Sequence, residues 1–123
     1  IALSVLTTVV GHQSEKGWII VDAGWMAMSR DRGTARQRRD CGYGIACDLE
    51  GQPLKENLIM IAANQEHGIL AATNGRFSVE NRFPIGTRLR ILPNHACATG
   101  AQFSEYQVAT DKGIETWRRF NGW

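Results

Sequence analysis

The sequence lacks the features that mark several classes of protein. No apolar run approaches the roughly 18 residues that a membrane-spanning helix needs, and no basic segment precedes the uncharged stretch Ile1–Ser14, as it would in a signal peptide. The net charge is only +2, which is small for a domain that binds nucleic acid through its phosphates. We therefore expect neither a membrane nor a nucleic acid as partner.

Cysteine is scarce, and its spacing does not suggest disulfides. The three cysteines, Cys41, Cys47 and Cys97, are an odd number at uneven positions. This pattern fits a reducing compartment, and we expect a cytoplasmic protein whose thiols are free for packing or for metal binding. Cys41 and Cys47 are assigned to packing, because neither has a second cysteine or a histidine close to it in the sequence.

The chain also lacks an initiator methionine and opens in a strand-like run. We therefore expect residues 1–123 to be a single domain cut from a longer polypeptide. A chain of 123 residues and 13.7 kDa can bury one independent core without disulfides.

Long amphipathic helices are missing as well, and strand signals dominate instead. Only Trp25–Ser29 and Ala101–Glu105 could each form one helical turn. Runs rich in β-branched or apolar residues are separated by turn signals such as Asn74-Gly75. The predicted strands are Ala2–Val10, Trp18–Val21, Leu58–Ala63, Ile69–Thr73, Thr87–Leu92, Tyr106–Thr110 and Ile114–Phe120.

This pattern predicts an all-β or β-dominated fold, an antiparallel barrel or sandwich with at most short helices. Leu58–Ala63 is apolar throughout and is predicted to be fully buried, whereas Thr87–Leu92 alternates. We expect Leu89, Ile91, Ile59 and Ile61 in the core.

The strongest chemical signal is the stretch from Pro93 to Gly100. If this stretch is extended, His95 and Cys97 point to the same face, about 6.5–7 Å apart, and both could reach one metal ion. A thiolate with an imidazole favours zinc. Two ligands do not complete a tetrahedron, so water, substrate or distant residues would fill the other positions. The alternative is a small buried cysteine beside a hydrogen-bonded histidine.

Two further segments carry groups that could do chemistry. Glu66 and His67 follow a predicted strand and could bind metal, position water or transfer protons; the alternative is a solvated turn ended by Gly68. Arg30–Arg39 is predicted to be a long loop whose arginines meet a phosphate, a carboxylate or a neighbouring domain, or else only solvent. His12 is expected on the surface.

Three blocks of sequence together resemble one known family. Ile19–Gly33 (IIVDAGWMAMSRDRG), Gln65–Gly68 (QEHG) and Ile85–Thr99 (IGTRLRILPNHACAT) resemble, in order and separation, blocks of the D-serine dehydratase-like C-terminal domain. That domain belongs to the D-serine dehydratase and D-threonine aldolase group of fold-type III pyridoxal-phosphate enzymes. Gln65 departs from the acidic residue that is more usual at that position in the family.

The resemblance implies a metal-binding β domain in a lyase that acts on β-hydroxy D-amino acids. In the family, an N-terminal (β/α)₈ barrel carries pyridoxal phosphate on a lysine, and the C-terminal domain supplies metal ligands that match His95 and Cys97. Cys97 favours zinc, with manganese or another divalent metal as alternative, and Thr99 is a candidate hydrogen-bond partner of His95 or Cys97.

The metal would activate the substrate's β-hydroxyl, either for dehydratase-type β-elimination or for retro-aldol cleavage. This domain does not decide between dehydratase, aldolase and racemase activity. Its partners would be its own barrel domain, the substrate and a second copy in a homodimer. We expect the isolated chain to be inactive, because Lys16, Lys55 and Lys112 lie in polar or turn-like contexts. The alternative function is a non-catalytic β-barrel module for interaction or metal binding.

Overall fold

The structure is a computed structural model that describes residues 2–75 and 77–120. Its strands are β1 (Val5–Gln13), β2 (Trp18–Val21), β3 (Gly44–Cys47), β4 (Leu58–Ala63), β5 (Gly68–Ala72), β6 (Arg88–Pro93), β7 (Glu105–Thr110) and β8 (Gly113–Arg118). The helical elements are a 3₁₀ turn (Ser14–Lys16), α1 (Val79–Arg82) and α2 (Ala96–Gly100). No helix in the described residues is long and apolar enough to cross a membrane.

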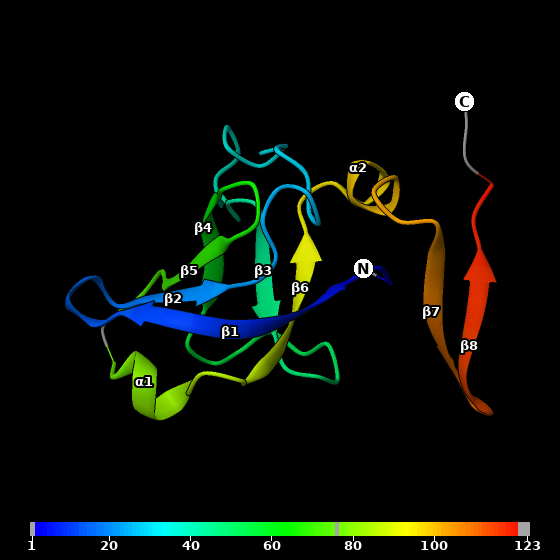
Figure 1. The fold of residues 1–123 in the computed structure, drawn as a ribbon. Helices are drawn as coiled ribbons and strands as arrows, with labels where there is room; N and C mark the ends of the chain where they lie inside the picture. The colour runs from blue at the N-terminus through cyan, green and yellow to red at the C-terminus, as the bar shows by residue number, and fades with distance from the viewer. Residues whose placement is uncertain (1, 76, 121–123) are drawn as a thin grey trace.

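Six strands close into an antiparallel barrel in the order β1-β2-β5-β4-β3-β6 (Figure 1). The predicted fold class is therefore confirmed. The long strand β1 pairs with β2 through one half and with β6 through the other, and its register shifts between Val9 and Gly11. A shift of this kind bends a strand, so that its two halves can follow the curvature of a small barrel and pair with different strands.

The barrel core is filled by one face of each strand. Leu89 and Ile91 in β6 are buried, as predicted. The prediction for β4 was wrong in phase: Met60 is fully buried, whereas Ile61 is 37% exposed and Ile59 is only half-buried. Because β4 is apolar on both faces, its sequence carries no alternation that could assign the inner face. The prediction that the whole strand is buried was wrong for the same reason.

The strand β3 was missed because it is short and opens with glycine. A Cβ atom on Gly44 would lie 2.5 Å from the backbone oxygen of Leu92 in β6, so the close approach of β3 to β6 requires a residue without a side chain. The same strand ends at Cys47, which is buried as its packing assignment predicted.

Two local predictions need correction. The second helical turn was expected at residues 101–105, but α2 occupies residues 96–100. His12 was expected to be a plain surface residue, but its ring nitrogen Nε2 lies 2.7 Å from the backbone oxygen of Phe83. This bond ties β1 to the end of α1. The expected turn at residues 25–29 is present, since the amides of Ala27 and Met28 both donate to Gly24.

The hairpin of β7 and β8 lies beside the barrel and follows α2 (Figure 1). Its strands pair in continuous register from Glu105–Arg118 to Thr110–Gly113. Arg119 connects the hairpin to α2, since its guanidinium donates to the backbone oxygens of Gly100 and Phe103.

Candidate metal site

The segment that carries the predicted ligands begins where β6 ends at Pro93. The side-chain amide of Asn94 donates to the backbone oxygen of Gly42 at 2.6 Å and to the hydroxyl of Thr34 at 2.8 Å. The Asn94 backbone amide donates to the oxygen of Tyr43 at 3.1 Å. Asn94 therefore fastens the start of the site to the long loop of residues 22–43.

The local conformation differs from the extended stretch that the sequence suggested. His95 has extended backbone angles (φ −129°, ψ 96°) and immediately precedes α2, so Cys97 lies in the first turn of a helix rather than on a strand. The backbone amide of Thr99 donates to the oxygen of His95 at 3.1 Å and closes that turn. The strand argument for a shared face is thus wrong, but both His95 and Cys97 are exposed at the start of α2.

An aspartate of the long loop meets the ring of His95. The carboxylate oxygen Oδ2 of Asp31 lies 2.5 Å from Nδ1 of His95, and both side chains are about half exposed. An ionised carboxylate can only accept a hydrogen bond, so in this contact Nδ1 carries the proton. When the ring is neutral, the lone pair of Nε2 is then available for a metal.

Asp31 was not singled out from the sequence as a site residue. It lies in the block Ile19–Gly33 that carries the family resemblance, and an acidic side chain in a long loop was the signal that could have found it. Asp31 lies 64 positions before His95. The contact between them could not be predicted, because no local spacing in the sequence relates the two residues.

The rest of the loop is organised around Asp40. Its carboxylate accepts from the Gly42 amide at 2.8 Å, from the Thr34 hydroxyl at 3.3 Å and from Arg32 at 2.5 Å. The hydrogen bond from Gly42, with the charge of Arg32 and the Thr34 bond, holds the pKa of Asp40 below its ordinary value, against a smaller opposing effect of burial. Arg32 is therefore engaged within the loop, and its guanidinium also stacks over Tyr43.

Thr99 does not play the role that was predicted for it. Its hydroxyl donates to the backbone oxygen of Met28, and Thr99 is buried. The side chain thus joins α2 to the loop of residues 22–43 rather than bonding to the side chain of His95 or Cys97.

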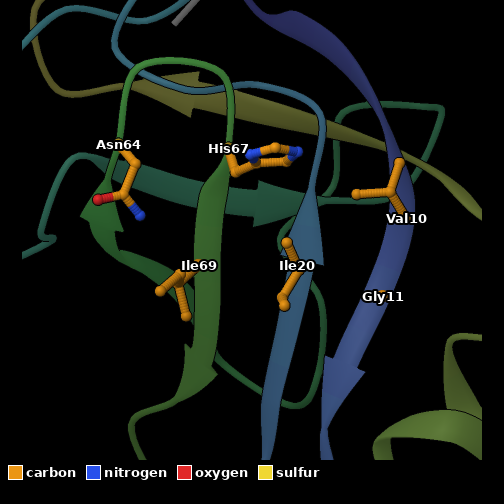
Figure 2. Close-up of a pocket in the computed structure, with 6 residues that line it drawn as sticks. All are labelled: Val10, Gly11, Ile20, Asn64, His67 and Ile69. Carbon is orange, nitrogen blue, oxygen red and sulfur yellow. The ribbon is translucent and has the colours of Figure 1, made fainter.

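Glu66 and His67 lie in the exposed turn between β4 and β5. The turn's backbone contacts the long loop, since Asn64 and Gln65 accept hydrogen bonds from the amides of Trp25 and Met26 at 2.7 Å and 3.3 Å. Asn64 and His67 stand at one end of a shallow groove of about 360 Å³ on the outside of the barrel (Figure 2). The residues lining it are Val10, Gly11, Ile20, Asn64, His67 and Ile69.

That groove includes none of His95, Cys97 and Asp31. Within residues 2–75 and 77–120, no three histidine, cysteine or carboxylate side chains converge as a metal site would need. The structure therefore does not bring Glu66 and His67 together with the predicted ligands into one cluster, and their catalytic role stays a prediction.

These features define a class of domain: a small closed β-barrel whose last barrel strand leads into an exposed histidine–cysteine pair. The family model described as "Putative serine dehydratase domain" matches residues 2–109. The chain belongs to this family.

Two curated relatives are dehydratases of D-amino acids. The chain is 63% identical to D-threo-3-hydroxyaspartate dehydratase from Delftia sp. (strain HT23), in a match that covers the whole chain and 33% of the relative. It is 35% identical to the D-serine dehydratase of Dictyostelium discoideum, in a match that covers 88% of the chain and 27% of the relative. The chain thus spans a third or less of the length of these relatives.

Solved structures agree with the sequence comparisons. The structure of the Delftia dehydratase superposes on this chain with a TM-score of 0.92 and 62% identity. The match covers all of this chain and 33% of the Delftia chain. That protein has also been solved as a histidine-to-alanine mutant and as a cysteine-to-alanine mutant in the metal-free form, with the two mutated positions two residues apart. D-threonine aldolase from Filomicrobium marinum, with a TM-score of 0.61 and 21% identity over 94% of this chain and 27% of its own, shares the fold.

Proposed function

We propose that this chain is the C-terminal β domain of a pyridoxal-phosphate-dependent dehydratase of β-hydroxy D-amino acids. In this proposal His95 and Cys97 hold a divalent metal, with zinc preferred. The observation that carries the proposal is the exposed His95–Cys97 pair at the start of α2, with Asp31 against the histidine ring. The solved histidine and cysteine mutants of the Delftia enzyme, one of them in a metal-free form, support it because their spacing equals that of His95 and Cys97.

The donor set fits such a metal. A thiolate and an imidazole are the ligands that zinc prefers, and a metal that does chemistry keeps positions open for water or substrate. The exposure of both side chains leaves those positions accessible. Because the described residues supply no third ligand in a cluster, the site is suited to an open metal and not to a closed structural one.

In this proposal, each residue of the site has a distinct role. A zinc ion held here would supply a Lewis acid for the substrate's β-hydroxyl, which helps hydroxide leave. His95 would bind through a ring nitrogen, and Cys97 would bind as the thiolate. Asn94 and Thr99 fix the two ends of the segment on the long loop, at Gly42 and Met28.

Pyridoxal phosphate does not fit the residues of this chain. Lys16, Lys55 and Lys112 are all exposed, and Lys16 stacks over Trp18. None of them has the enclosed setting that a covalently bound cofactor needs. We therefore assign the cofactor to an N-terminal barrel domain of the same polypeptide. The length of the dehydratase relatives, about three times that of this chain, supports this.

Dehydration is preferred over retro-aldol cleavage as the reaction. The 63% identity to a dehydratase supports this, whereas the resemblance to the aldolase extends to the fold alone. D-threo-3-hydroxyaspartate and D-serine are the substrates to test first. A cytoplasmic location and a homodimer stay predictions.

The decisive experiment uses the full-length protein with both substrates. We expect His95→Ala and Cys97→Ala to abolish turnover while circular dichroism and cofactor absorbance stay unchanged, and chelation to abolish wild-type turnover until zinc is restored. Cys41→Ala is the matched control and should stay active. Full activity in chelated enzyme, or in either site variant, would show that the metal role is wrong.

A further inference from the structure

The contact between Asp31 and His95 suggests a role for a residue that does not itself bind the metal. We propose that Asp31 is a positioning residue: it holds the Nδ1–H of His95 and thereby presents Nε2 to the metal. This inference rests on the proposed function. To the proposed metal site, the inference adds the residue that sets the orientation and the tautomer of the histidine ligand.

The geometry favours this role over a simple surface ion pair. The two atoms are 2.5 Å apart, a short distance for a charge-assisted hydrogen bond. Because both side chains are about half exposed, the pair contributes little to stability on its own. A metal-bound histidine, in contrast, usually donates its second N–H to a carboxylate or carbonyl, which fixes the ring and raises its basicity.

The backbone around Asp31 is held so that its side chain stays at His95. The Asp31 amide donates to the hydroxyl of Ser29 at 3.3 Å. Ser29 is nearly buried and has φ 134°, a conformation that a residue with a side chain rarely adopts. Strained backbone of this kind persists where the surroundings impose it and is common at functional sites.

A second connection holds the loop against α2 next to that strained residue. The hydroxyl of Thr99, two positions after Cys97, donates to the oxygen of Met28. The loop that carries the carboxylate therefore meets the segment that carries the ligands through Met28 and Thr99 as well as through Asp31 and His95. Removing the Asp31 carboxylate leaves the second point intact, so the fold should survive.

The test compares Asp31→Ala and Asp31→Asn with Asp111→Asn, an exposed aspartate in the β7–β8 turn. Zinc affinity is measured on the full-length protein by competition with a chromophoric chelator. We expect Asp31→Ala to weaken zinc binding about 10–100-fold, and Asp31→Asn to weaken it less, because an amide oxygen still accepts from Nδ1–H. Asp111→Asn should bind zinc as the wild type does.

A second measurement needs neither activity nor metal. Long-range ¹H–¹⁵N spectra of the metal-free full-length protein report which ring nitrogen of His95 carries the proton. We expect the Nδ1–H form in the wild type and a shift toward the Nε2–H form in Asp31→Ala. The thermal unfolding midpoint should stay close to that of the wild type in both Asp31 variants, since an exposed ion pair contributes little to stability.

The outcomes separate this inference from the proposed function. If Cys97→Ala loses zinc while Asp31→Ala binds it as tightly as the wild type, with unchanged ring signals, the metal site stands and the role of Asp31 is wrong. If Cys97→Ala also keeps wild-type affinity, both the metal site and the role of Asp31 are wrong.

Discussion

The hydroxyl of Thr99 in α2 donates a hydrogen bond to the backbone oxygen of Met28, which lies 71 positions earlier in the chain. Both residues are 1% exposed. A buried carbonyl and a buried hydroxyl satisfy each other here, and the bond joins the helix that carries Cys97 to the loop that carries Asp31.

Replacing this hydroxyl should therefore destabilise the protein. In Thr99→Val the shape is kept but the oxygen of Met28 is left buried without its donor, which costs about 1–3 kcal/mol. We expect the free energy of unfolding in urea to fall by that amount. Thr99→Ser keeps the hydroxyl and should lose less. Equal losses in the two variants would mean that the methyl group, not the hydrogen bond, matters at this position.

The inner face of β4 can be tested with two adjacent substitutions. Met60 is fully buried and Ile61 is 37% exposed. Met60→Ala should reduce the free energy of unfolding by about 2–5 kcal/mol, whereas Ile61→Ala should reduce it by clearly less, because part of the Ile61 side chain is exposed to solvent in the folded state. Denaturant unfolding followed by tryptophan fluorescence measures both. The reverse order of the two losses would contradict the strand phase described above.

The three cysteines should react at different rates. Cys97 is exposed and Cys41 is partly buried, whereas burial, with a contribution from the charge of Asp48, raises the pKa of the Cys47 thiol. Because the thiolate is the reactive form, iodoacetamide near neutral pH should label Cys97 first and Cys47 only after unfolding. Peptide mass spectrometry over time identifies the order. Added zinc should slow the labelling of Cys97 and leave Cys41 unchanged.

Asp40 should make the loop of residues 22–43 sensitive to acid. Its pKa is lowered below the ordinary value of 3.8, chiefly by the hydrogen bond from the Gly42 amide. A lowered pKa means that the ionised form stabilises the folded state, so the effect is present above about pH 4 and disappears as the pH falls through the folded-state pKa.

Asp40→Asn is the variant that isolates this contribution. Its thermal unfolding midpoint should lie below that of the wild type at neutral pH, and the two should converge as the pH falls through the lowered pKa of Asp40. Amide exchange at Gly42 should accelerate in the variant at neutral pH. A difference that persists unchanged into strong acid would mean that the charge of Asp40 is not the cause.

Much of the fold could be predicted from local pattern. Trp18–Val21 and Leu58–Ala63 have the predicted bounds, and the strands predicted at residues 106–110 and 114–120 overlap β7 and β8. These segments are rich in residues that favour strands and end at turn residues, which are local properties. Gly44–Cys47 was missed, because its strand depends on the partner β6 and on the space that Gly44 leaves there.

The candidate site divides in the same way. The sequence by itself determined the fold class and the likeness to the family, and it singled out His95 and Cys97 as candidate ligands, because residue type and short spacing carry that information. Only the tertiary structure decided that Cys97 lies in a helical turn, that Thr99 bonds to Met28, and that Asp31 meets His95. The last two contacts join segments more than sixty positions apart, and closing of the barrel, not any local preference, brings such segments together.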